Sequence, residues 1–315
     1  MITKRALLST LAAAAMLPGV AFADGHSAMN VALISKGFQH QFWQAVQSGA
    51  EQAAEELGVT ITYEGPDSES QVDRQIDMLA AALSRNPDAI GFAALDSQAA
   101  IPLLRDAQSR EVPIIAFDSG VDSDIPLTTA STDNVAAAAL AADRMAELLG
   151  GAGKVAVVAH DQTSRTGIDR RDGFVNRIKS EYPNMEIVTV QYGGGDQLRS
   201  TELTRSILTA HPDLAGIFGT NEGSAIGVVN GVRESGREGL VVIGYDSGAA
   251  QINAVRDGLM AGAITQNPVG IGYETVRAAV AAAKGEEVPP AIDTGFFWYD
   301  ASNIDDPEIQ AVLYE

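Results

Sequence analysis

The sequence predicts an α/β protein built from two doubly wound parallel-sheet lobes. Short apolar runs typical of buried strands alternate with helical patterns along the chain, which is the signature of βαβ units. Roughly nine such runs exceed what one compact doubly wound domain holds. A mature chain of 292 residues, counted after a predicted leader of 23, is long enough for two cores.

The strand-like runs are found by composition and length. They are Val31–Ser35, Val59–Tyr63, Ala89–Ala94, Pro113–Phe117, Lys154–Ala159, Ile187–Val190, Leu214–Phe218, Leu240–Tyr245 and Gly262–Thr265. Apolar residues at helical spacing lie between them. One predicted helix face carries Phe42, Val46, Ala50, Ala53 and Leu57, a second carries Ile76, Leu79, Ala80 and Leu83, and a third carries Leu203, Ile207 and Leu208. Right-handed crossovers then place helices on both faces of each sheet.

The division between the lobes leaves only a weak trace in the sequence. Thr128–Asn134 is polar and loses periodicity at its end, so it is the best candidate for the first crossing. No low-complexity linker and no repeat of about 20–50 residues is visible, as expected for lobes joined by several short segments. The two halves resemble each other only in pattern.

The N-terminus has the pattern of a secretory signal peptide. Lys4 and Arg5 precede the apolar stretch Ala6–Val20, and Ala21–Ala23 fits the small-x-small rule for a cleavage site. We expect cleavage after Ala23 and export to the periplasm. The alternative, a buried N-terminal helix, fits poorly because the stretch lies at the extreme N-terminus and carries no charge after Arg5. No later stretch approaches about 20 uninterrupted apolar residues.

Composition excludes several classes of protein. The chain has no cysteine, which rules out disulfides, thiolate metal sites and a lipid attached through cysteine. The formal charge is −20, and removing Lys4 and Arg5 with the leader makes it −22, so nucleic acid is repelled. The acidity serves solubility or, alternatively, docking of a basic partner. A hydrophobic fraction of 46% indicates a folded chain.

Polar and aromatic residues follow the predicted strands in both halves of the chain. Ligands of open parallel sheets bind at the carboxyl ends of the strands, so these residues are the candidates for a shared cleft. They are Lys36, His40, Phe42 and Trp43 after the first strand, Asp118 and Ser119 after the fourth, Arg170 opening the helix after Lys154–Ala159, Asn221 after Leu214–Phe218, Asp246 after Tyr245, and Gln266 at the end of Gly262–Thr265. Each taken singly is equally well explained as a helix cap or turn residue.

The chemistry of this set suits a ligand with many hydroxyl groups. Carboxylates and guanidinium groups bind pairs of neighbouring hydroxyls, and amides such as Asn221 and Gln266 both donate and accept. Aromatic faces cover the C–H face of a sugar ring, although the helical spacing of Phe42 and Trp43 with Val46 places at least one of the two in the core.

Catalytic and metal motifs are poorly matched. The run Gly150–Lys154 resembles a phosphate loop, but Leu148 stands at the first glycine position and Val155 replaces Ser or Thr. The four histidines are too scattered for a metal site, and Asp118, Asp122 and Asp124 lack calcium-loop spacing. We therefore expect no catalytic residue, no metal and no cofactor.

Nearly the whole mature chain resembles the type I periplasmic binding proteins of sugar ABC transporters, in the ribose-binding branch. The segments that carry the resemblance are Val31–Trp43 (VALISKGFQHQFW), Ile114–Gly120 (IIAFDSG), Thr132–Asn134 (TDN), Arg170–Phe174 (RRDGF), Thr209–Asp213 (TAHPD), Gly219–Gly227 (GTNEGSAIG), Val242–Asp246 (VIGYD) and Ile264–Pro268 (ITQNP).

The resemblance implies which residues touch the ligand and where the chain changes lobe. It implies ligand contacts by Phe42, Asp118, Arg170, Asn221, Asp246 and Gln266, with Lys36, His40, Trp43 and Tyr245 lining the pocket. It implies crossings near Thr132, Asn267 and Gly295, hence an N-terminal lobe of residues 24–132 plus 267–295 and a C-terminal lobe of 133–266 plus 296–315. The chain departs from the ribose binders at Lys36, His40, Ser119 and Gly195, which puts ribose itself in doubt.

The resemblance also implies partners. They are a small sugar or polyol, a membrane permease with its ATPase, and, as a further candidate, a chemoreceptor. We expect a monomer that closes on its ligand by a hinge motion.

Three rival functions are compatible with parts of the sequence. A sensing repressor needs an N-terminal DNA-binding helix pair, where this chain has its leader. A sugar-modifying enzyme would use Asp118 and Asp246 as an acid/base pair, although both are better explained as hydroxyl acceptors. A binder of a nucleoside or signalling furanose stays open, and so does the role of Lys36, which either favours an anionic ligand or pairs with a pocket carboxylate such as Asp118.

Overall fold

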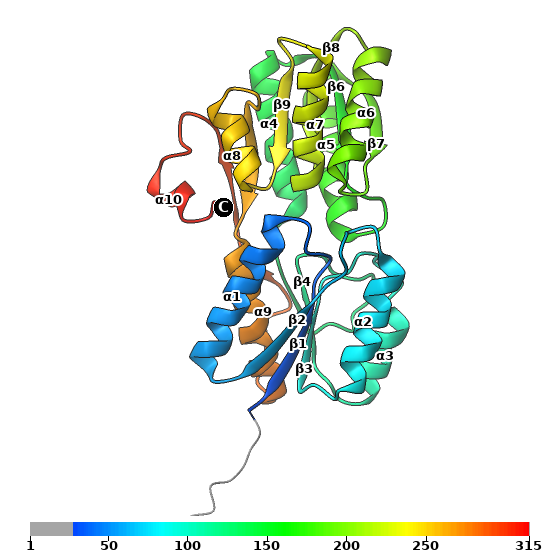
Figure 1. Cartoon of the computed structure of the whole chain (residues 1–315), viewed down its shortest axis with the longest axis vertical. Coiled ribbons are helices and arrows are strands. Elements are labelled where there is room, and N and C mark those ends of the chain that lie inside the picture. The colour runs from blue at the N-terminus through cyan, green and yellow to red at the C-terminus, as the bar shows by residue number, and fades with distance from the viewer. Residues whose placement is uncertain (1–27, 315) are drawn as a thin grey trace, which may run out of the picture.

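Two six-stranded sheets organise the part of the chain that the structure describes, residues 28–314 of a computed structural model. The strand orders are β11-β5-β4-β3-β1-β2 and β12-β10-β9-β8-β6-β7, and every neighbouring pair is parallel except the antiparallel β10–β12 pair. The two lobes therefore share one doubly wound topology and lie one above the other along the long axis of the molecule (Figure 1). The predicted leader, residues 1–23, and its cleavage point lie outside the described residues.

The first lobe is built around the first sheet. Its strands are β1 (Asn30–Ile34), β2 (Thr60–Glu64), β3 (Ala89–Phe92), β4 (Ile114–Phe117), β5 (Thr128–Ser131) and β11 (Ile292–Asp293). Its helices are α1 (Gln41–Leu57), α2 (Val72–Ser84), α3 (Ile101–Ser109) and α9 (Pro268–Ala283). Val31 and Leu33 pack under α1 and α9, whereas Ala32 and Ile34 pack under α2 and α3. The apolar run of β1 is thus explained by burial on both faces of a parallel sheet.

The second lobe repeats this arrangement. Its strands are β6 (Ala152–Ala159), β7 (Asn184–Tyr192), β8 (Leu214–Gly219), β9 (Val241–Tyr245), β10 (Gly262–Gln266) and β12 (Phe296–Tyr299). Its helices are α4 (Asn134–Leu149), α5 (Arg165–Glu181), α6 (Gln197–Ala210), α7 (Glu222–Ser235), α8 (Ala249–Arg256) and the short α10 (Pro307–Gln310). Helices α4 and α5 cover one face, and α6, α7 and α8 cover the other.

The predicted fold class is confirmed, and each of the strand-like runs forms a strand. Three strands, β5, β11 and β12, were not predicted from the sequence. β5 reads Thr-Thr-Ala-Ser and β11 has two residues, so neither presents an apolar run. β12 is an antiparallel edge strand outside the βαβ pattern. Two residues of the predicted apolar helix faces are exposed. Leu57 is the last residue of α1, and Ala80 lies on the solvent side of α2.

Helix α9 lies against α1 at close backbone distance, which joins a late segment of the chain to the first lobe. A Cβ on Gly49 would overlap the carbonyl of Val269, and one on Gly272 would overlap the carbonyl of Val46. Only glycine permits this approach, so both glycines are packing residues. Within residues 28–314, no helix combines the length and the apolar character that crossing a membrane requires.

The chain passes between the sheets at three places, after β5, after β10 and between β11 and β12. A side chain holds these connections together. The Thr132 hydroxyl donates to Gln266 Oε1 at 2.9 Å and lies 3.4 Å from the carbonyl oxygen of Gly295. All three connections therefore meet at one point between the lobes.

Candidate functional site

Two aspartates follow equivalent strands of the two lobes in an unusual backbone conformation. Asp118 follows β4 with φ of 54°, and Asp246 follows β9 with φ of 83°. Positive φ is uncommon for residues other than glycine, and such conformations concentrate at functional sites. Both residues are buried, although carboxylates are rarely buried without a partner. The fold thus places one carboxylate from each lobe where the sheets face each other.

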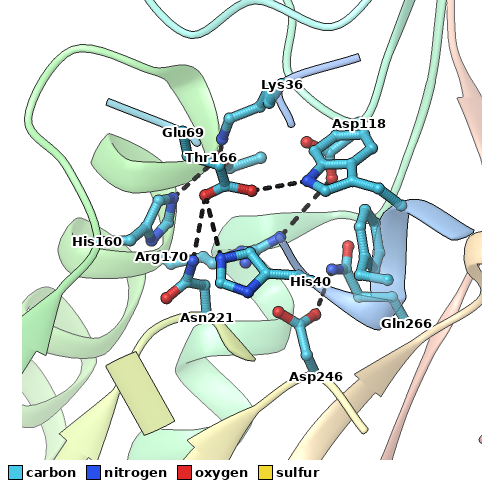
Figure 2. Close-up of a pocket in the computed structure, with 12 residues that line it drawn as sticks. Lys36, His40, Glu69, Asp118, His160, Thr166, Arg170, Asn221, Asp246 and Gln266 are labelled. Carbon is cyan, nitrogen blue, oxygen red and sulfur yellow. Dashed lines mark hydrogen bonds and ion pairs between the residues drawn. The ribbon is translucent and has the colours of Figure 1, made fainter. Parts of the chain in front are cut away.

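A polar cavity lies at this junction (Figure 2). It is lined by Lys36, His40, Phe42, Trp43, Glu69, Asp118, His160, Thr166, Arg170, Asn221, Asp246 and Gln266.

Asp118 is the carboxylate of this cavity with the fewest protein partners. Its nearest cation is Arg170, whose Nη2 lies 3.9 Å from Asp118 Oδ1. Burial raises the pKa of Asp118 to about 6, against the lowering effect of Lys36 and Arg170. The chain continues from Asp118 through a loop to β5, so the residue has no helix to cap. Its oxygens are available to accept hydrogen bonds from a ligand.

Arg170 is held rigidly beside Asp118. Its Nε donates to Asn134 Oδ1 at 2.7 Å and its Nη1 donates to the carbonyl of Thr220 at 3.0 Å. The guanidinium lies 3.8 Å from the ring centroid of Tyr245, a cation–π contact. These contacts fix the plane of the guanidinium and leave Nη2 directed toward Asp118.

Asp246 is more fully paired than Asp118. Its Oδ1 accepts from Gln266 Nε2 at 2.7 Å, and its Oδ2 accepts from the backbone N–H of Glu222 at 2.8 Å. Since Gln266 Oε1 also accepts from Thr132, Gln266 connects the cavity to the point where the lobe connections meet.

Lys36 spans the two lobes. Its Nζ donates to Thr166 Oγ1 at 3.0 Å and lies 3.5 Å from Ser164 Oγ, both at the start of α5. Thr166 also contacts His160 Nε2 at 3.2 Å, while His160 Nδ1 contacts Thr220. Burial lowers the pKa of His160 to about 3, so this ring is neutral at physiological pH.

Glu69 occupies the middle of the site (Figure 2). Its Oε1 accepts from Trp43 Nε1 at 2.8 Å, and its Oε2 accepts from Asn221 Nδ2 at 3.2 Å in the other lobe. Burial alone would raise the pKa of this carboxyl, but the charge of Lys36 and the Trp43 hydrogen bond contribute to holding it below its usual value. Glu69 is therefore an ionised carboxylate shared by both lobes.

His40 presents an unpartnered polar atom. Its Nε2 lies 2.9 Å from Gln39 Nε2 and 4.0 Å from Glu69 Oε2, whereas its Nδ1 is buried without a hydrogen-bond partner among the described residues. A buried polar atom without a partner is costly, so it points to a bond that the ligand completes.

The structure brings together nine of the eleven candidate residues. Ser119 and Tyr245 do not line the cavity: Ser119 is fully buried, and the ring of Tyr245 contacts the Arg170 guanidinium. Arg170 lies in the second turn of α5, which begins at Arg165, so it does not open that helix. Phe42 and Trp43 belong to the core and line the cavity as well. Asn221 also caps α7 through its Oδ1, so the cap interpretation and the site interpretation both hold for it.

Three further residues that line the cavity were not predicted from the sequence: Glu69, His160 and Thr166. His160 directly follows β6, so the rule of searching strand ends would have found it. Glu69 lies five residues beyond β2 in a polar loop, and Thr166 lies in the first turn of α5, where sequence alone gives no signal. Among residues 28–314, no group of three or more acidic, histidine or cysteine side chains is placed to hold a metal ion.

Comparison with known proteins gives the family. A model described as a periplasmic binding protein domain matches residues 31–287. The chain is 25% identical to the ribose import binding protein RbsB of Escherichia coli (strain K12), covering 89% of this chain and 94% of that protein. A solute-binding protein of Agrobacterium vitis, solved with D-fucose, is 34% identical with a TM-score of 0.88, covering 90% and 100%. One from Agrobacterium radiobacter, solved with D-arabinose, is 30% identical with a TM-score of 0.88, covering 91% and 99%.

Two α/β lobes with a polar cavity between them are the architecture of a two-lobed binding protein. The chain belongs to the periplasmic binding protein family. The predicted resemblance is confirmed, as is the expectation that the chain is a binding protein of an importer rather than an enzyme. Membership of this family implies a periplasmic location.

Proposed function

We propose that the protein captures a monosaccharide or polyol between its lobes and delivers it to the permease of an ABC importer. The observation that carries this proposal is the pair of unsatisfied polar groups in the cavity, the Asp118 carboxylate and His40 Nδ1. One is a pure acceptor and the other donates or accepts, which is what neighbouring hydroxyls require. The relatives named with ribose, D-fucose and D-arabinose support the same class of ligand.

The ligand contacts that we propose follow from the cavity. Lys36, His40, Phe42, Trp43, Asp118, Arg170, Asn221, Asp246 and Gln266 would touch the ligand, joined by Glu69, His160 and Thr166. Ser119 and Tyr245 would act indirectly. We also propose that the lobes divide at residues 132, 266 and 295, in line with the membership of the strands in the two sheets.

A thermal-shift screen of pentoses, hexoses, polyols and nucleosides tests the proposal. A ligand at a thousandfold excess over its Kd stabilises the protein by about 4 kcal/mol. We expect sugars or polyols to raise the melting temperature. A rise with nucleosides alone would favour the alternative ligand class, for which the aromatic side chains Phe42 and Trp43 are the supporting observation.

The proposed location and partners follow from the leader and the family. We propose that residues 1–23 are removed, that the mature protein is a monomer starting near Asp24, and that it docks on a permease served by an ATPase. A chemoreceptor is a further candidate partner. Osmotic shock should release a protein whose mass corresponds to cleavage after Ala23. An intact Met1 in the released pool would contradict this prediction.

A further inference from the structure

The side chain of Glu69 is one of the cavity groups that the sequence pattern did not predict. It is 8% exposed, comes from the loop between β2 and α2, and is bound from both lobes by Trp43 and Asn221. The backbone N–H of Glu69 donates to Gln39 Oε1 at 3.2 Å, so the residue is fixed at the backbone as well. Its carboxylate is thus a permanent part of the cavity wall.

The charges around the cavity decide what Glu69 does. Lys36 and Arg170 are the cationic side chains of the wall, and they face the carboxylates of Glu69, Asp118 and Asp246. The neutral ring of His160 adds no charge. The wall thus carries two cationic side chains against three carboxylates. An anionic ligand would add to this excess of negative charge in a buried site, which is unfavourable.

We infer that Glu69 is a specificity-determining residue that makes the site select uncharged polyhydroxyl ligands over their carboxylate counterparts. The inference rests on the proposed function and refines it: Lys36 bonds Thr166 and Ser164 across the lobes, and its charge offsets the pocket carboxylates rather than binding an anionic ligand. Uncharged sugars donate hydroxyls to Asp118 and Glu69, whereas a sugar acid brings its carboxylate into the field of the same groups.

Calorimetric titration with matched pairs tests the inference. The probes are D-galactose with D-galacturonate, D-arabinitol with D-arabinonate, and D-glucitol with D-gluconate. We expect the native protein to bind the neutral member of its best pair at least about tenfold more tightly than the acid, given one unit charge a few ångströms away. Glu69→Gln should reduce that ratio at least about tenfold, because it removes one negative charge. Its amide keeps an oxygen to accept from Trp43.

Two controls separate the charge from the shape of the side chain. Glu69→Asp keeps the charge and should keep the preference for the neutral member. Glu64→Gln removes an exposed carboxylate paired with Arg85 and should change nothing. A native protein that prefers the acid, or a ratio unchanged in Glu69→Gln, would overturn the inference while leaving sugar binding intact. Failure of all six probes and of all other sugars and polyols to bind would overturn the proposed function itself.

Discussion

The burial of Asp118 favours ligand binding but lowers the stability of the fold at neutral pH. Its pKa in the folded protein is raised from 3.8 to about 6 by burial. A carboxyl with a raised pKa contributes stability when protonated, so its contribution grows as pH falls from about 6 to 3.8 and is lost above that window. At neutral pH the ionised side chain therefore lowers the stability of the fold, and a ligand compensates by donating hydroxyls to it.

The first prediction follows from this conflict. Asp118→Asn removes the charge and keeps the shape, and asparagine tolerates positive φ well. We expect the melting temperature at neutral pH to rise and the affinity for ligand to fall at least about tenfold, since hydrogen bonds to charged groups contribute about 1.5–3 kcal/mol. Titration calorimetry beside melting curves measures both. A lowered melting temperature with normal affinity would show that Asp118 is structural.

A second prediction concerns pH. Ligand hydroxyls bind the ionised form of Asp118, so affinity should fall as pH falls through about 6. The groups that face this carboxylate are Lys36, Arg170, Glu69 and Asp246. Titrations in two buffers of different ionisation enthalpy should detect proton release on binding near that pH. In Asp118→Asn both effects should be absent, and their persistence would assign the titration to another group.

At the scale of single residues, the sequence predicted which residues lie at the cavity better than it predicted what each side chain contacts. Polar side chains after strands are found by position, because parallel strands end at one edge; hence Asp118, Asp246 and Asn221 lie at the cavity. Tyr245 was placed correctly in the chain but faces Arg170, since side chains alternate along a strand. Whether a side chain is free or paired depends on partners far away in the sequence, as with Asn221 and Glu69, which are 152 residues apart.

At the scale of elements, two helix N-termini are capped across the lobes. The N-cap of α1, His40, makes no side-chain cap bond; instead Glu222 accepts from the backbone N–H groups of Gln41 and Phe42 at 3.1 and 3.2 Å. In return, Gln41 Oε1 accepts from the backbone N–H of Ala249, the first residue of α8. The N-cap of α8 is Gly248, which has no side chain to cap the helix. Closure of the lobes thus satisfies donors that would otherwise face water.

A third prediction tests this reciprocal capping. Glu222→Ala and Gln41→Ala should each weaken ligand affinity by about fivefold, because a cap is worth about 1 kcal/mol and these caps exist only when the lobes meet. Asp196→Ala is the matched control, since Asp196 caps α6 within one lobe. It should lower the melting temperature and leave affinity unchanged. Equal affinity losses in all three variants would contradict a specific role for the caps.

The sequence predicted the elements well where burial dictates composition. Strands covered on both faces, such as β1 and β4, are nearly all apolar and were recognised. The polar β5 and the antiparallel β12 lie near the edges of their sheets, where composition is less constrained. The capping by Glu222 could not be predicted, because its partner Gln41 is 181 residues away.

At the scale of the whole molecule, the lobes meet along more than the cavity. The N–H of Ser97 donates to the carbonyl of Thr163 at 2.9 Å, and Arg165 lies 3.5 Å from Asp122 across the lobes. The three connections meet at Thr132, whose hydroxyl contacts Gln266 and Gly295. This arrangement allows a rotation about the connections that separates the lobes while each sheet stays intact.

The last prediction is that ligand binding drives this closure. Without ligand, the carboxylates of Asp118, Glu69 and Asp246 repel one another across the junction, and the open form lets water reach them. Bound hydroxyls bridge the lobes and favour the closed form. Small-angle scattering should therefore show a smaller radius of gyration at saturating ligand than without it. Asp118→Asn at the same ligand concentration should keep more of the unliganded radius, because its affinity is lower. Equal radii for the native protein in both conditions would contradict ligand-driven closure.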